Sequence, residues 1–160
     1  MPRRLHPVEL DFAESAPVRL VFTGDISASP EAVYRALAED VTDWPAWFDA
    51  VSSAVPTRDG AGRDVKLKGG IFFSETVMAT DPHERYAYRV DTTNAPGLRA
   101  LLEEWAITPT AQGSRVRWTF AVDGPAPVRA LLRLSRAGLG TSFRRAIRRL
   151  DRRLARSATS

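Results

Sequence analysis

The sequence predicts an α+β fold, in which a curved antiparallel sheet of about seven strands is followed by one long C-terminal helix. Three observations carry this prediction. A strand pattern over residues 18–28 precedes two short helical segments, apolar residues alternate with polar ones from residue 50 to residue 123, and apolar residues recur every three or four positions from Val128 to Leu154. The length of 160 residues fits one domain.

The N-terminal residues 1–16 show little periodicity, so we expect a flexible arm ahead of a single domain over residues 17–156, with a tail at 157–160. Arg3 and Arg4 could begin an export signal, but Glu9 and Asp11 stand where such a signal needs apolar residues. No stretch reaches the length of a membrane span. The sequence therefore predicts a cytoplasmic protein.

The first strand is predicted over Val18–Ala28, where apolar and polar residues alternate. Ser29 is a suitable N-cap for a helix over Glu31–Ala38, and Pro30 fits its first turn. A short aromatic turn or helix follows at Trp44–Phe48.

Six further strands are predicted near residues 50–58, 63–69, 71–80, 85–93, 100–109 and 114–123. Turn sequences such as Asp59-Gly60 and Gly69-Gly70 separate them. Strands that follow one another by hairpins form an antiparallel sheet, and the alternation indicates that one face is covered.

The remaining residues predict an amphipathic helix, whose apolar side includes Leu132, Leu139 and Phe143. Gly138 and Gly140 interrupt this pattern, and each costs about 1 kcal/mol relative to alanine in a helix. We expect them to mark a bend, or a place where another backbone or a ligand comes close.

Several short sequences accompany this predicted order of strands and helices: Ile26–Tyr34, Trp44-Pro45-Ala46-Trp47, Glu75-Thr76-Val77, Asp81-Pro82, Arg85–Tyr88, Trp105–Pro109 and Gly113–Trp118. Together they resemble the helix-grip (SRPBCC) superfamily, which includes START-type lipid-transfer domains, birch-pollen-type allergens and polyketide cyclase/dehydrase-like proteins. The resemblance covers residues 18–156 and is nearest to the bacterial polyketide cyclase-like branch.

The resemblance implies an apolar cavity between the concave face of the sheet and the terminal helix. Some members of the superfamily carry lipids, some bind hormones and some cyclise aromatic polyketides. Catalytic residues in the cyclases are scattered over the cavity, so the resemblance transfers no catalytic residue to this chain.

The candidate ligand-binding residues are apolar and aromatic side chains of the covered face of the sheet and of the helix. In a domain with one core, such residues usually fill the interior, and this remains the alternative interpretation. The resemblance favours the wall of a cavity for at least some of them. The candidates are Phe73, Tyr86, Tyr88, Trp105, Trp118, Phe120, Leu132, Leu139 and Phe143.

Two carboxylates, Glu75 and Glu103, are the only candidates for acid–base chemistry, and no catalytic residue is assigned. Glu75 is in phase with Phe73, and Glu103 is in phase with Trp105. An inward carboxyl in an apolar cavity would have a raised pKa and could transfer protons. Because unpaired buried acids are rare, the sequence favours an outward orientation for both.

Other classes of site are excluded or disfavoured. The chain has no cysteine, and its two histidines, His6 and His83, are far apart in sequence, so we expect no metal site and no hydrolase triad. Gly69-Gly70 and Gly138-Leu139-Gly140 match neither phosphate-binding nor dinucleotide-binding patterns. We expect no cofactor.

The positive net charge of +4 comes from the C-terminal helix, since residues 127–156 contain ten arginines and a single acid, Asp151. A solvated helix face is the favoured interpretation, and contact with an anionic membrane or an acidic partner is the alternative. No nucleic-acid-binding motif accompanies this charge, so nucleic acid is not an expected partner. The arginines concerned are Arg144, Arg145, Arg148, Arg149, Arg152 and Arg153.

The favoured function is binding, as a carrier or sensor, of a hydrophobic or amphipathic small molecule such as a lipid, an acyl chain or a polyketide-like aromatic. The first alternative is a cyclase or dehydratase that uses the same cavity. The second is a regulator that docks through the arginine face. The sequence leaves both a monomer and a homodimer open.

Overall fold

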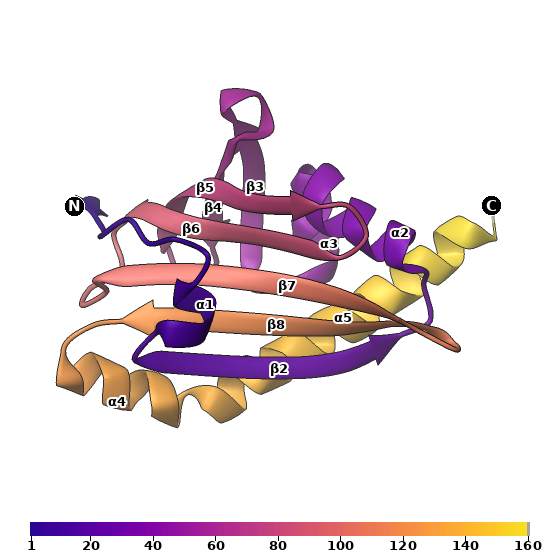
Figure 1. Ribbon diagram of the computed structural model, residues 1–160. Helices are drawn as coiled ribbons and strands as arrows, with labels where there is room; N and C mark the ends of the chain where they lie inside the picture. The colour runs from indigo at the N-terminus through magenta and orange to yellow at the C-terminus, as the bar shows by residue number, and fades with distance from the viewer. Residues whose placement is uncertain (160) are drawn as a thin grey trace.

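The computed structural model describes residues 1–159, which form one antiparallel sheet with helices on both faces (Figure 1). The strand order is β2-β8-β7-β6-β5-β4-β3, and β1 pairs with β6. The bounds are β1 (Arg3–Arg4), β2 (Val18–Ile26), β3 (Val51–Thr57), β4 (Gly62–Leu67), β5 (Phe72–Asp81), β6 (Arg85–Thr93), β7 (Ala100–Thr110) and β8 (Gly113–Asp123).

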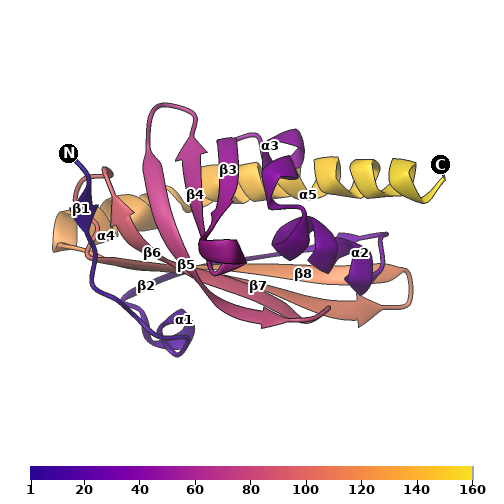
Figure 2. The same ribbon diagram turned by 90° about the horizontal axis from the view of Figure 1, so that it is seen from above.

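The long helix α5 crosses the concave face of the sheet, and α2 and α3 lie on the same side, whereas α1 lies on the opposite face (Figure 2). The predicted α+β helix-grip fold is confirmed. The bounds are α1 (Phe12–Ser15), α2 (Pro30–Tyr34), the π-helical turn η1 (Arg35–Glu39), the 3₁₀ turn η2 (Val41–Asp43), α3 (Trp44–Trp47), the 3₁₀ turn η3 (Arg58–Gly60), α4 (Ala126–Leu134) and α5 (Arg136–Ala158).

The strand β2 and the helix α2 form where the local sequence pattern predicts a strand and a helix. Val18, Leu20 and Phe22 of β2 are buried, while Arg19 between them is exposed. Ser29 caps α2, because its hydroxyl accepts a hydrogen bond from the Ala32 amide over 3.2 Å.

Curvature of the sheet brings β3 and β4 across the direction of β7 and β8 (Figure 1). Two register irregularities interrupt the pairing of β5 with β6, one between Ser74 and Glu75 and one between Val77 and Ala79. Irregularities of this kind bend a strand and increase its twist. The bend produces the concave face that α5 covers.

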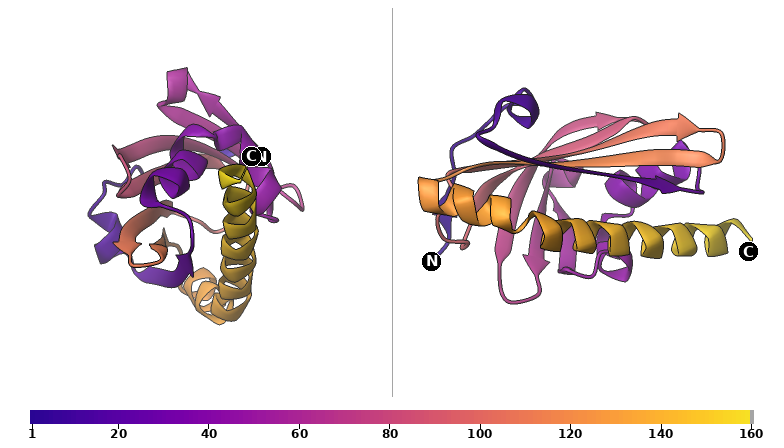
Figure 3. Two further views of the ribbon diagram at one scale, coloured as in Figure 1. Left: turned by 90° about the vertical axis from the view of Figure 1, so that its right-hand side faces the viewer. Right: turned by 90° about the horizontal axis from the view of Figure 1, so that it is seen from below.

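The C-terminal helical region bends at Ser135, not at the glycines, so the sequence-based position of the bend is wrong (Figure 3). The Ser135 hydroxyl donates a hydrogen bond to the Leu131 carbonyl over 2.8 Å. Serine hydroxyls that bond to the preceding turn favour such bends. The alternative expectation is the close approach of another backbone or a ligand. Gly140 packs instead against a side chain, the Phe22 ring, and Gly138 faces open space.

Residues 1–16, expected to form an arm, contact the sheet in this structure. Arg3 and Arg4 pair with Thr93 and Thr92 of β6 and make the sheet one strand longer than predicted. Leu5 is buried, and α1 contacts β7 and β8 on the face opposite α5.

One hydrophobic core connects the sheet with the helices on its concave side. Its centre is aromatic: Trp105 stacks on Trp118 with 5.4 Å between ring centroids, and Phe143 of α5 packs on Trp118 at 6.0 Å. Trp44 of α3 meets the Trp105 ring edge-on at 5.6 Å. These contacts fix α3 and α5 over the sheet.

Candidate functional site

A cavity of about 160 Å³ lies between the concave face of the sheet and α5, and we call it the central cavity. Its walls are mostly apolar and aromatic, and a few polar side chains are gathered among them. The lining residues are Trp44, Phe48, Ala50, Val51, Arg63, Val65, Leu67, Phe73, Glu75, Tyr88, Glu103, Trp118, Phe120, Leu139 and Ser142.

Among the predicted ligand-binding residues, the structure places Phe73, Tyr88, Trp118, Phe120 and Leu139 in the cavity lining. The others lie elsewhere. Tyr86, Trp105 and Phe143 belong to the buried core behind the lining, and Leu132 of α4 is only partly buried against that core.

Both candidate carboxyls line the central cavity, so the outward orientation favoured by the sequence is wrong. Glu75 is 1% exposed and Glu103 is 8% exposed. Each carboxyl has polar partners that reduce the cost of its burial, and these partners lie on other strands.

Glu75 is paired with Arg63, which lies directly opposite it in the register of β4 and β5. The Arg63 Nε donates a hydrogen bond to Glu75 Oε2, and the two side chains form a fully buried ion pair. The guanidinium carbon of Arg63 also lies 3.8 Å from the centroid of the Tyr88 ring and 4.3 Å from that of Trp44. Aromatic faces stabilise a guanidinium at such distances.

Glu103 is held by two donors that meet at one of its oxygens. The Trp118 Nε1 donates to Glu103 Oε1 over 2.9 Å, and the Tyr88 hydroxyl donates to the same oxygen over 3.2 Å. The Tyr88 hydroxyl in turn accepts a hydrogen bond from Trp105 Nε1 over 3.1 Å. These contacts form a continuous buried network.

Burial raises the pKa of Glu75 to about 7, because the cost of removing its charge from water exceeds the attraction of Arg63. Burial also raises the pKa of Glu103, although the Arg63 charge and the Trp118 and Tyr88 donors act against it. Burial opposes the charged form of Arg63, but the charge of Glu75 holds its pKa above the usual value. The cavity therefore contains a permanent cation beside two carboxyls that retain protons more strongly than usual.

Arg63 is the main residue that the sequence interpretation missed. It shares strand phase with Val65 and Leu67, so the alternation in β4 places it on the covered face. An arginine in phase with buried apolar residues, on the strand next to an inward glutamate, was the available signal. Trp44 and Phe48, which the sequence predicts only as part of a short aromatic turn or helix, also line the cavity.

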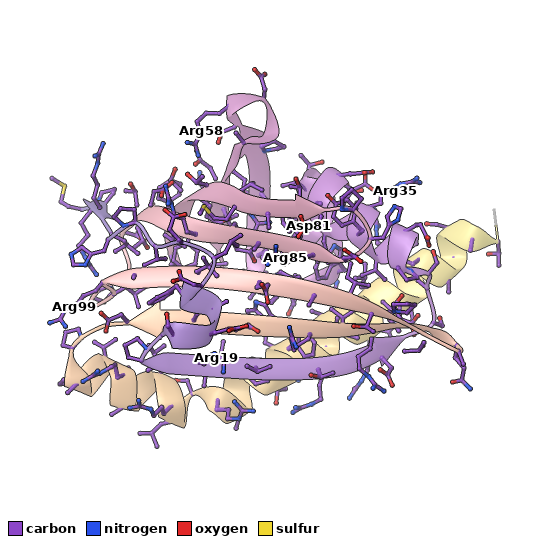
Figure 4. The ribbon with its side chains drawn as sticks, viewed as in Figure 1. Arg19, Arg35, Arg58, Asp81, Arg85 and Arg99 are labelled. Carbon is purple, nitrogen blue, oxygen red and sulfur yellow. The ribbon has the colours of Figure 1, made fainter. Side chains whose placement is uncertain are left out.

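A wider depression of about 520 Å³ lies on the opposite face of the sheet beside α1. It is lined by charged residues, including Arg19 and Arg85, which are labelled in Figure 4. Arg85 pairs with Asp81 over 2.8 Å and with Glu104 over 3.5 Å. Because the charged side chains of this depression form ion pairs with one another and face water, the central cavity is the better candidate for binding an apolar molecule.

The arginine face of α5 is partly used within the chain. Arg149 pairs with Asp49 and Arg153 pairs with Asp43, each over 3.1 Å, and these contacts join α5 to the α3 region. Arg144, Arg145, Arg148 and Arg152 are exposed. Contact of this face with an anionic membrane stays a prediction.

Within residues 1–159, no cluster of histidine and carboxylate side chains has the arrangement of a metal site, and no helix is long and apolar enough to cross a membrane. His83 lies in the turn before β6, with its Nδ1 3.9 Å from Glu31 Oε1, and does not line the central cavity. His6 lies in the N-terminal segment.

Comparison with known proteins matches residues 17–155 to a family described as polyketide cyclase / dehydrase and lipid transport. An uncharacterized protein of Mycobacterium tuberculosis is 31% identical over 150 residues, which cover 91% of this chain and 89% of the relative. The granaticin polyketide synthase bifunctional cyclase/dehydratase of Streptomyces violaceoruber is 32% identical over 116 residues, or 66% of this chain and 36% of the relative.

Among solved structures, a START superfamily protein from Mycobacterium smegmatis superposes with a TM-score of 0.69 at 13% identity. The superposition covers 86% of this chain and 97% of the other. At that level of identity the likeness concerns the fold.

Proposed function

Because the chain belongs to the polyketide cyclase / dehydrase and lipid transport family, we propose that it binds a small hydrophobic molecule containing a ring in the central cavity. The observation that carries the proposal is an apolar cavity with aromatic walls and a few polar groups at one place. Apolar walls supply affinity by removing hydrophobic surface from water, and the polar groups fix the orientation of the ligand.

The size of the cavity narrows the class of ligand. An apolar cavity of about 150 Å³ accepts one benzene ring, and pockets for larger ligands usually measure about 300–1,000 Å³. At about 160 Å³ the central cavity matches a single substituted ring. A long acyl chain would need the cavity to widen, so a ring is the favoured ligand.

The test uses toluene as the ring probe and oleate as the acyl-chain probe, with binding measured by the chemical shifts of the tryptophan indole N–H groups. Ser142 lines the cavity, whereas its neighbour Thr141 is exposed and does not. We expect wild type and Thr141→Phe to bind toluene, and Ser142→Phe to bind it at least about tenfold more weakly because the added ring fills the cavity. Equal binding by all three proteins, or no binding by wild type, would overturn the proposal.

A second candidate function is supported by the inward orientation of Glu75 and Glu103 in the same cavity. A carboxylate there could accept the proton next to the carbonyl of a β-hydroxy ketone, while a protonated carboxyl donates a proton to the departing hydroxyl. The products are an unsaturated ketone and water. The pKa of Glu75, raised to about 7 by burial, suits either proton transfer.

This dehydration is tested with the aldol of benzaldehyde and acetone, whose dehydrated product absorbs in the ultraviolet. The enzyme interpretation expects wild type to accelerate the loss of water and the double variant Glu75→Gln/Glu103→Gln to lose at least about 100-fold of that rate. Full turnover by the double variant would remove both carboxyls from the mechanism. Binding of toluene without any turnover would leave the chain as a binding protein.

A further inference from the structure

The Arg63 side chain is 2% exposed, lines the central cavity, and has one nitrogen, Nη1, with no hydrogen-bond partner. A guanidinium carries five N–H donors and remains charged at any physiological pH. Buried N–H donors of charged groups are almost always hydrogen-bonded, so we expect the unpaired Arg63 Nη1 beside the apolar cavity to bind an acceptor.

The described residues around Arg63 do not supply it. The Nε of Arg63 is already bonded to Glu75 Oε2. Glu103 Oε1 is occupied by donors from Trp118 and Tyr88. The two faces of the guanidinium are covered by the Tyr88 and Trp44 rings. Nη1 itself has almost no exposed surface, but the Arg63 side chain lines the cavity, so a ligand acceptor reaches Nη1 through a small shift of that side chain.

The charges nearby indicate which acceptor fits. One guanidinium already faces two carboxyls, Glu75 and Glu103, and the Coulomb attraction of Arg63 acts on both. A ligand carboxylate or phosphate would add a further negative charge beside them, which is costly in an apolar interior. A neutral carbonyl oxygen accepts the hydrogen bond without that cost.

We propose that Arg63 Nη1 anchors the ligand by donating a hydrogen bond to a neutral carbonyl oxygen, so that the preferred ligand class is a single ring carrying a ketone or aldehyde. The inference rests on the proposed function, because it assumes that a ring occupies the central cavity. Arg63 is then a residue that determines specificity, whereas the aromatic walls provide most of the affinity.

The test compares two probes of almost equal shape, acetophenone and α-methylstyrene, which differ by having C=O in place of C=CH₂. We expect wild type to bind acetophenone about tenfold more tightly, since a hydrogen bond to a charged donor contributes at least that factor. Benzoate, the anionic probe, should bind more weakly than acetophenone. The guanidinium ¹⁵N–¹H signals of Arg63 should shift with acetophenone and not with α-methylstyrene.

Variants show whether Arg63 causes the preference. Arg63→Met alone leaves Glu75 buried without its partner, so the informative protein is Arg63→Met/Glu75→Gln, in which the two charges are removed together. It should bind both neutral probes with equal affinity. Lys66→Met is the matched control, because Lys66 is an exposed cation of the same strand, and it should keep the wild-type preference.

The outcomes separate this inference from the proposed function. Equal binding of acetophenone and α-methylstyrene to wild type would overturn the role of Arg63 and leave the ring-binding cavity intact. Tighter binding of benzoate would overturn the neutral acceptor. Failure of every probe to bind wild type would remove the proposed function itself. If the double variant does not fold, the affinities of wild type for the two neutral probes and the guanidinium ¹⁵N–¹H signals of Arg63 still decide whether Arg63 binds the carbonyl.

Discussion

Tyr88 and Glu103 lie directly opposite each other on β6 and β7, and the Tyr88 hydroxyl donates a hydrogen bond to Glu103 Oε1 over 3.2 Å. The same hydroxyl accepts a hydrogen bond from Trp105 Nε1. One side chain therefore satisfies a buried carboxyl at the cavity and a buried indole behind it. This pairing links the polar part of the central cavity to the aromatic core.

The substitution Tyr88→Phe removes both hydrogen bonds while keeping the ring. Trp105 Nε1 would lose its partner, and Glu103 would keep only the Trp118 donor. We expect the free energy of unfolding to fall by about 1–3 kcal/mol, the usual cost of leaving a buried polar group unpaired. Urea unfolding measures this loss, and an unchanged midpoint would show that the network contributes nothing to stability.

The stability of the protein should depend on pH through Glu75. Its pKa is about 7 in the folded protein, against 4.5 for an ordinary glutamate, so the folded state binds more protons than the unfolded state between these values. The contribution of Glu75 is therefore fully present below pH 4.5 and is lost as the pH rises through about 7. Glu103, whose pKa burial also raises, acts in the same direction.

Urea unfolding at about pH 5 and at about pH 8 tests this dependence. Glu75→Gln, which cannot ionise, should lose less stability than wild type between the two conditions. Glu84→Gln changes an exposed carboxyl in the turn before β6 and serves as the control that keeps the wild-type difference. A Glu75→Gln protein with the full wild-type pH dependence would contradict the assignment.

Arg63 and Glu75 should be strongly coupled in a double-mutant cycle. Arg63→Met or Glu75→Leu alone leaves an unpaired charged or polar group in the interior, and we expect each to cost about 3–5 kcal/mol. The double variant Arg63→Met/Glu75→Leu should recover most of that loss, because apolar residues can replace a buried pair. Unfolding free energies that simply add would show that the two side chains act independently.

Two glycines of α5 should respond differently to alanine. A Cβ at Gly138 would meet no atom within 4 Å, so Gly138→Ala should stabilise the protein by about 0.5–1 kcal/mol through helix propensity. A Cβ at Gly140 would lie 3.2 Å from Phe22 Cε1, so Gly140→Ala should lose this gain because the ring must move. Thermal unfolding of the two variants compares them, and a larger gain at Gly140 would contradict the packing described.

The strands and the residues they direct inward could be predicted because period-2 alternation is a local property of the sequence. Phe73, Trp118 and Phe120 reach the cavity lining for this reason. Glu75 also points inward as its strand phase predicts. The sequence favours the outward orientation only because the alternation within one strand does not identify a cation that could pair with a buried carboxylate. That partner, Arg63, comes from the neighbouring strand, and its contact depends on the β4–β5 register.

Features that depend on packing could not be read from the pattern. Trp118 lines the cavity, whereas Trp105, stacked on it at 5.4 Å, lies in the core behind, although both were expected on the covered face. Which of the two indole rings lines the central cavity depends on how α3 and α5 pack against the sheet. The bend at Ser135 likewise accompanies a hydrogen bond of the serine hydroxyl to the Leu131 carbonyl. The sequence pattern does not show this bond and favours the nearby glycines, Gly138 and Gly140, as the position of the bend.

The central claim, that one apolar ring occupies the central cavity, is tested most directly by diffraction from crystals of the wild-type protein soaked in bromobenzene. The account predicts an anomalous bromine peak inside the cavity, between Phe73 and Trp118 on the sheet and Leu139 on α5. Bromine peaks confined to the surface, or a cavity filled by its own side chains, would contradict it.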